Sequence, residues 1–139
     1  MKPFSLLGLL RLRKLQEDKA AASLAVARRS QRDTAARIAH THARLASVDA
    51  TVATSDELFA IAATRSSSAS MLADLAQLER QQAEEVEALA LSHAESVRAA
   101  RSIEKLEERH AEEQAGADLA AEQRVLDELA VRRDRGSDA

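Results

Sequence analysis

Apolar side chains recur every seven residues along the first half of the chain. The repeat consists of Leu24, Gln31, Ile38, Leu45, Val52 and Phe59, with Val48 and Ala62 at the intervening heptad position. Such a repeat places its side chains along one face of a helix and is typical of a coiled coil. The pattern predicts a long helix with one face packed against another helix.

The second half of the chain carries a weaker version of the same pattern. Its apolar positions are Leu72, Leu75, Val86, Leu89, Ala100 and Ile103. Polar residues hold other positions of the same face, namely Glu79, Gln82, His93 and Ser96. The phase slips before Leu119, Leu126 and Leu129, and such a slip changes the supercoil locally. We therefore predict a second helix with a polar, imperfect seam.

Glycine and proline are absent from the 107 residues between Gly8 and Gly116. The strongest composition change is the serine cluster of residues 64–70, where hydroxyls compete with the helix for backbone hydrogen bonds. We predict a turn at 64–70, between a helix over 4–63 and a helix over 71–134, with a disordered tail at 135–139. The predicted fold is all-α, a single antiparallel coiled-coil hairpin spanning residues 1–139.

Composition and charge agree with this fold. Charged residues make up 31% of the chain and aromatic residues 1%, as is typical of long helices with a thin core. Residues 1–44 contain ten Lys or Arg against three Asp or Glu, whereas residues 71–123 contain five against thirteen. Opposite charges favour pairing of the two helices, although each exposed pair contributes only about 0.2–1 kcal/mol.

The beginning of the chain is apolar on nearly all sides of the predicted helix. Phe4, Leu6, Leu9 and Leu10 lie close together in sequence, followed by basic residues. One neighbouring helix cannot cover every side, so this end is expected to bind another protein or a membrane surface. The alternative is that Phe4, Leu6 and Leu10 pack on Leu126 and Leu129.

No catalytic, cofactor or metal site is predicted, and the chain is not expected to be an enzyme. The Glu107–His110 spacing resembles half of a di-iron motif, but the second half is missing. Phosphate loops, nucleophile elbows and zinc spacings are absent, and the chain has no cysteine. The net charge of −3 and the lack of interleaved aromatic residues argue against nucleic acid as a partner. No segment is long and apolar enough to span a bilayer.

Both ends of the chain carry a more specific pattern. The opening Phe4-x-Leu6-x-x-Leu9-Leu10 is followed by Arg11, Arg13, Lys14 and Glu17-Asp18. The closing part contains Glu104-Lys105-Leu106-x-x-Arg109, then Glu122-Gln123-x-x-Leu126-Asp127-Glu128-Leu129-Ala130 and Arg132-Arg133. Together these segments resemble the FliJ family of the bacterial flagellar type III export apparatus. Residues 21–99 match that family only in being helical.

The resemblance implies a two-helix coiled coil similar to the stalk subunit of rotary ATPases. It implies three partners: the hexameric export ATPase (FliI-like), the export gate protein (FlhA-like) and export chaperones. It also implies a cytoplasmic location, peripheral at the inner face of the cell membrane. The residues expected to bind partners are Phe4, Leu6, Leu9, Leu10, Arg13, Glu122, Gln123, Leu126, Asp127 and Glu128.

Simpler interpretations remain beside the export function. Asp127 and Glu128 also have Arg11, Arg13 and Arg124 as potential ion-pair partners, without any role in binding. Three other functions remain: an injectisome-type secretion stalk, a membrane-surface amphipathic protein and a generic structural coiled coil.

Overall fold

The computed structural model describes residues 6–48, 51 and 54–137. It contains two helices, α1 (Leu6–Ala46) and α2 (Ser55–Ser137), of 41 and 83 residues. Two units make up the structure. The hairpin unit comprises residues 16–96, and the terminal unit comprises residues 1–15 and 97–139, described from 6–15 and 97–137.

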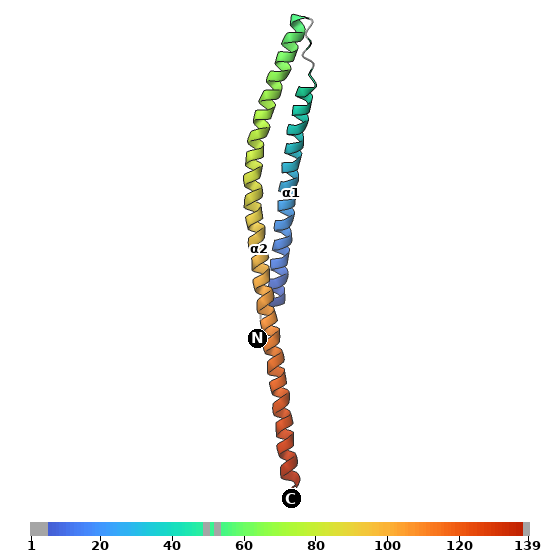
Figure 1. Ribbon diagram of the computed structural model, residues 1–139. Coiled ribbons are helices and arrows are strands. Elements are labelled where there is room, and N and C mark those ends of the chain that lie inside the picture. Colours follow the sequence, from blue (N-terminus) through green and yellow to red (C-terminus); the bar gives the residue numbers. More distant parts are fainter. Residues whose placement is uncertain (1–5, 49–50, 52–53, 138–139) are drawn as a thin grey trace. The chain divides into compact units, whose positions relative to one another are not determined.

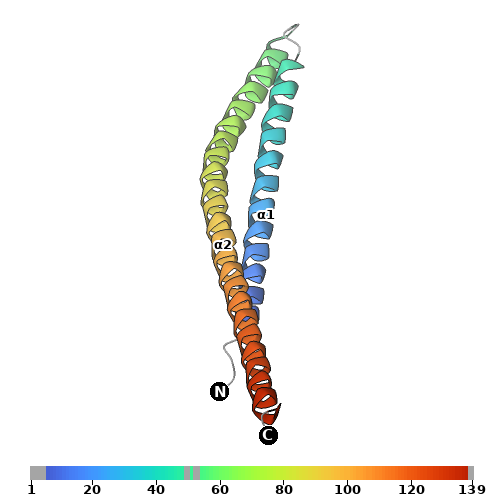
Figure 2. The same ribbon diagram turned by 60° about the horizontal axis from the view of Figure 1, so that its bottom comes forward.

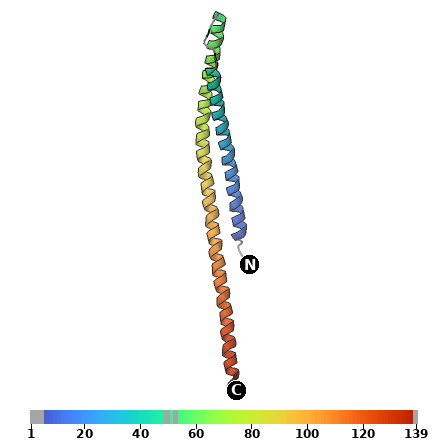
Figure 3. The same ribbon diagram turned by 45° about the vertical axis from the view of Figure 1, so that its right-hand side comes forward.

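The two helices run antiparallel within the hairpin unit. Thr41 of α1 lies beside Met71 of α2, with 3.8 Å between Oγ1 and Sδ. Further back along α1, Ala27 and Ser30 line a surface groove together with Leu89 of α2. Lower residue numbers in α1 thus face higher numbers in α2, and the helices lie side by side in all three views (Figures 1, 2 and 3). The predicted all-α two-helix hairpin is confirmed.

The predicted turn at residues 64–70 is wrong, because α2 passes through this segment without interruption. Thr64 donates its hydroxyl to the carbonyl of Ala60 at 2.9 Å, so its side chain bonds within the helix rather than breaking it. The chain reverses instead between Ala46 and Ser55. Residues 47, 48, 51 and 54 are not helical and residues 55–63 belong to α2, whereas the prediction placed 4–63 in one helix. Residues 135–137 are helical, whereas the prediction placed them in a disordered tail. Positions 4–5, 49–50, 52–53 and 138–139 lie outside the described residues.

A cap at Thr54 explains why α2 begins where it does. The Thr54 hydroxyl accepts a hydrogen bond from the backbone N–H of Glu57 at 3.2 Å. The sequence Thr54-Ser55-Asp56-Glu57 is a capping box, in which a hydroxyl residue and a glutamate three residues later mark a helix start. Asp56 and Glu57 also place negative charge at the positive end of the helix dipole.

The heptad seam of α1 lies where the sequence predicts it. Leu24 is buried, and Gln31, Ile38 and Leu45 are half-buried along the same face. Val48, just after the helix, is also half-buried, whereas Val52 lies outside the described residues. Thr34 and Thr41 fill intervening positions, and each donates its hydroxyl to its own helix, to the carbonyls of Ser30 and Arg37. These bonds remove the cost of burying the two hydroxyls.

The prediction fails for the last two positions of the first repeat. Phe59 is 73% exposed and Ala62 is exposed, while Ile61 between them is half-buried. Both residues belong to α2, so the heptad phase of α1 does not continue to them across the reversal of the chain.

The seam of α2 also follows the predicted positions. Leu75 and Ala100 are buried, and Leu72, Val86, Leu89 and Ile103 are half-buried. The polar seam positions Gln82, His93 and Ser96 are half-buried as well, whereas Glu79 is exposed. Among the described residues, the buried apolar side chains are Leu24, Ala27, Leu75 and Ala100. The core is therefore thin, as the composition indicates.

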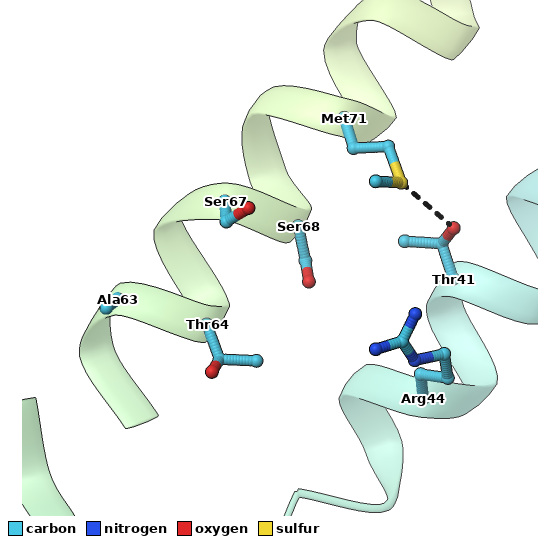
Figure 4. Close-up of a pocket in the computed structure, with 7 residues that line it drawn as sticks. All are labelled: Thr41, Arg44, Ala63, Thr64, Ser67, Ser68 and Met71. Carbon is cyan, nitrogen blue, oxygen red and sulfur yellow. Dashed lines mark hydrogen bonds between the residues drawn. The ribbon is translucent and has the colours of Figure 1, made fainter. Parts of the chain in front are cut away.

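An open groove lies close to the reversal of the chain (Figure 4). Its volume is about 350 Å³. The Thr41–Met71 contact closes one end of it, and Arg44 extends along its α1 side. The α2 side is lined mainly by small and hydroxyl residues, Ala63, Thr64, Ser67 and Ser68. These small residues leave a space between the helices that larger side chains would fill.

Candidate partner-binding site

An ion pair joins the two helices in the terminal unit. The Lys14 Nζ atom lies 3.0 Å from Glu104 Oε1, joining the first part of α1 to α2. The Lys14 and Glu104 side chains are 56% and 41% exposed, so water screens the attraction between them. The contact shows that the start of α1 lies close to this part of α2.

The first turns of α1 present leucines on more than one side. Leu6, Leu9 and Leu10 are half-buried. The opposite side carries exposed leucines, with Leu7 at 55% and Leu15 at 65%. The expectation that one neighbouring helix cannot cover this segment is therefore confirmed.

The predicted binding residues that the structure describes in this segment all lie on its half-buried side. Leu6, Leu9, Leu10 and Arg13 are half-buried, and Phe4 lies outside the described residues. The exposed leucines Leu7, Leu12 and Leu15 were not among the predicted binding residues. The heptad phase could have identified them, because the side opposite the seam must face solvent.

The C-terminal part of α2, residues 108–137, is exposed at every position. We call it the C-terminal segment. In the views of Figures 1 and 3 no other described helix runs beside it within the terminal unit. It contains the remaining predicted binding residues, Glu122, Gln123, Leu126, Asp127 and Glu128.

The alternative, in which Leu6 and Leu10 pack on Leu126 and Leu129, is wrong, and Phe4 lies outside the described residues. These two leucines are 59% and 55% exposed. Glu107 is the last residue of α2 that is not exposed, so the cover that α1 gives to α2 ends near it. Leu126 lies 19 residues beyond Glu107 (126 − 107), or about 28 Å along a helix. The structure therefore does not bring the two predicted sets of binding residues together.

Local contacts organise the middle of the C-terminal segment. The Gln123 side-chain amide donates to Asp127 Oδ1 at 3.1 Å, one helical turn away. Beside this pair, Ala121, Glu122, Val125 and Leu126 line a shallow groove of about 440 Å³. The exposed side chains of Leu119, Val125, Leu126 and Leu129 form an apolar strip with carboxylates along its edge, an arrangement suited to binding another helix.

Comparison with protein-family models, curated proteins and solved structures finds no match for this chain.

Two further observations concern other classes of site. Neither described helix contains a stretch with the length and apolar character needed to cross a membrane. Across residues 6–48, 51 and 54–137, no three histidine, cysteine or acidic side chains gather in a way that would hold a metal ion.

Part of the apolar strip on the C-terminal segment was not predicted to bind partners. Leu119 is 66% exposed and Val125 is 56% exposed, and neither was among the predicted binding residues. The phase slip before Leu119 was the available signal, because it moves these residues away from the seam that packs on α1.

Proposed function

We propose that this chain is a non-enzymatic component of the bacterial flagellar protein export apparatus. In this proposal it binds the hexameric export ATPase as a stalk and links the ATPase to the export gate and to export chaperones. The proposal is supported by the two-helix hairpin and by the motifs at the two ends of the chain. It also places the protein in the cytoplasm, peripheral at the inner face of the cell membrane.

The observation that carries the proposal is the exposure of the C-terminal segment. Leu119, Leu126 and Leu129 are each more than half exposed on a helix that has no described neighbour there. A helix with an uncovered apolar strip gains free energy when a partner covers it, at about 25 cal/mol per Å² of apolar surface. The carboxylates of Asp127 and Glu128 next to the strip would give such binding its orientation.

Binding of the full-length chain to a purified hexameric export ATPase tests the proposal. The test variant combines Leu9→Ala, Asp127→Lys and Glu128→Lys, and the matched control combines Glu84→Lys with Glu87→Lys in the exposed part of the hairpin unit. We expect the unmodified chain and the control to bind the ATPase and raise its turnover. The test variant should lose both effects. Equal binding by the test variant and the unmodified chain would refute contact through the ends.

A membrane-surface function is the second candidate, and one observation favours it. Leu7, Leu12 and Leu15 are exposed on α1 close to the basic residues Arg11 and Lys14. Exposed leucines beside basic residues are the features that bind helices to anionic membranes. Cosedimentation with anionic vesicles tests this candidate. Deleting residues 4–15 should abolish vesicle binding if it is right, and unchanged vesicle binding would exclude it.

An injectisome-type stalk shares the geometry of the first proposal and differs in its partner. Binding assays with an injectisome ATPase in parallel with the flagellar ATPase distinguish these two stalk functions. A generic structural coiled coil would bind neither ATPase.

A further inference from the structure

The C-terminal segment carries opposite charges toward its two ends, on the same side as its leucines. At about 3.6 residues per turn, Glu108, Glu112, Leu119, Leu126 and Arg133 lie along one side of the helix. We call these five residues the C-terminal face. All five are exposed. The face therefore runs from acidic through apolar to basic.

We propose that the C-terminal face binds the same face of a second copy of this chain in an antiparallel pair. A two-fold axis between Glu122 and Gln123 would place Leu119 against Leu126 of the second copy. The same axis would place Arg133 against Glu112 of the second copy. The symmetry repeats both contacts, so the order of charges along one helix makes the face complementary to itself.

The charges at the two ends of the C-terminal face also set the orientation of the pair. A parallel pair would instead bring Glu112 against Glu112 and Arg133 against Arg133. Like charges across an interface disfavour that arrangement, so the charges select the antiparallel orientation.

The pairing contains one unfavourable contact, at the axis itself. Glu122 would lie beside Glu122 of the second copy, and both carboxylates would be negatively charged. Replacing Glu122 by Gln removes this repulsion and keeps the size of the side chain. The proposal therefore predicts that Glu122→Gln strengthens the dimer.

The pairing goes beyond the proposed export function, because it needs no ATPase. It uses residues of the same segment, including Glu122 and Leu126, that the export proposal assigns to partner binding. The dimer and an ATPase-bound form would then exclude each other. Self-association is measured with the full chain alone, so its failure is distinguishable from a failure of ATPase binding.

Sedimentation equilibrium of charge variants tests the contacts. We expect the unmodified chain to form dimers as its concentration rises. Arg133→Glu should weaken the dimer about tenfold or more, as should Glu112→Arg. An equimolar mixture of the two variants should dimerise as the unmodified chain does, because each end then joins opposite charges. The proposal would be overturned if the unmodified chain stayed monomeric at all concentrations up to about 1 mM. It would also be overturned if the mixture of the two variants did not regain dimerisation.

Cysteine crosslinking tests the position of the axis, since the chain has no cysteine of its own. Gln123→Cys, next to the axis, should form a disulfide-linked dimer under mild oxidation. Ala115→Cys is the matched control on the same segment. Its two copies would lie about 22 Å apart in the antiparallel pair, beyond the reach of a disulfide. Crosslinking of Ala115→Cys without crosslinking of Gln123→Cys would contradict this geometry.

Discussion

Lys14 and Glu104 face each other across the two helices of the terminal unit, with 3.0 Å between Nζ and Oε1. Ninety residues of sequence separate them, and they come from the basic and the acidic part of the chain. The contact agrees with the charge pattern that favours antiparallel pairing. It also leaves the end of α2 beyond the reach of the described part of α1.

We predict that this ion pair contributes little to stability. Both side chains are about half exposed, so a double-mutant cycle with Lys14→Met and Glu104→Gln should give a coupling free energy of about 0.2–1 kcal/mol. Urea unfolding at low salt measures it, and the coupling should shrink at high salt. A coupling of several kcal/mol, insensitive to salt, would contradict this prediction.

Gln82 is expected to lower the stability of the hairpin unit. It lies seven residues from both Leu75 and Leu89 in the α2 seam, and its buried Oε1 has no hydrogen-bond partner among the described residues. Gln82→Leu should raise the free energy of unfolding by about 1–2 kcal/mol, because it removes an unsatisfied acceptor and adds apolar contact. The exposed neighbour Gln81→Leu is the control and should change stability little. Destabilisation by Gln82→Leu would show that the amide has a partner that supports the seam.

Gly116 is expected to weaken α2 locally. A methyl group added at this position meets no atom within 4 Å, and the backbone is helical. Gly116→Ala should therefore stabilise the helix by about 0.4–1 kcal/mol, mainly by restricting the unfolded chain. Gly136→Ala, in the last turn of α2, is the control and should have a smaller effect because helix ends fray. Circular dichroism during thermal unfolding measures both. A loss of helix content in Gly116→Ala would contradict the prediction.

Proline substitution distinguishes the start of α2 from its interior. Ser55 follows the Thr54 cap as the first residue of α2, a position where proline is well tolerated. Ser67 lies three turns further on within the same helix. We expect Ser55→Pro to leave unfolding nearly unchanged and Ser67→Pro to cost about 3 kcal/mol or more. If Ser55→Pro lowered the stability more than Ser67→Pro, the result would instead support a turn at residues 64–70.

The sequence contains most of the fold, and the main failure is the position of the turn. The seam positions Leu24, Leu75 and Ala100 were predictable because burial must follow the heptad period whatever the loop does. The turn was placed at the serine cluster because serine lowers helix propensity. That preference is weak, and the Thr64 hydroxyl bonds to the Ala60 carbonyl within the helix rather than interrupting it. The capping box at Thr54–Glu57 was the stronger signal, because it supplies specific hydrogen bonds.

The error in the turn also explains what was missed at the candidate site. A turn at 64–70 makes the two helices nearly equal and brings Leu126 close to the start of the chain. The observed turn instead places Glu104 opposite Lys14, and Leu126 loses that neighbour. The residue types at the two ends could be chosen from the sequence. Which of them are exposed depends on the register, which composition does not determine.

Crosslinking across the helices tests the antiparallel register most directly, because the chain offers no competing cysteine. In the structure Thr41 lies beside Met71, whereas a turn centred on Ser67 would place Thr41 near His93. We predict that the double variant Thr41→Cys with Met71→Cys forms an intramolecular disulfide, and that Thr41→Cys with His93→Cys does not. A disulfide in the second variant but not in the first would contradict the register on which the exposed C-terminal segment depends.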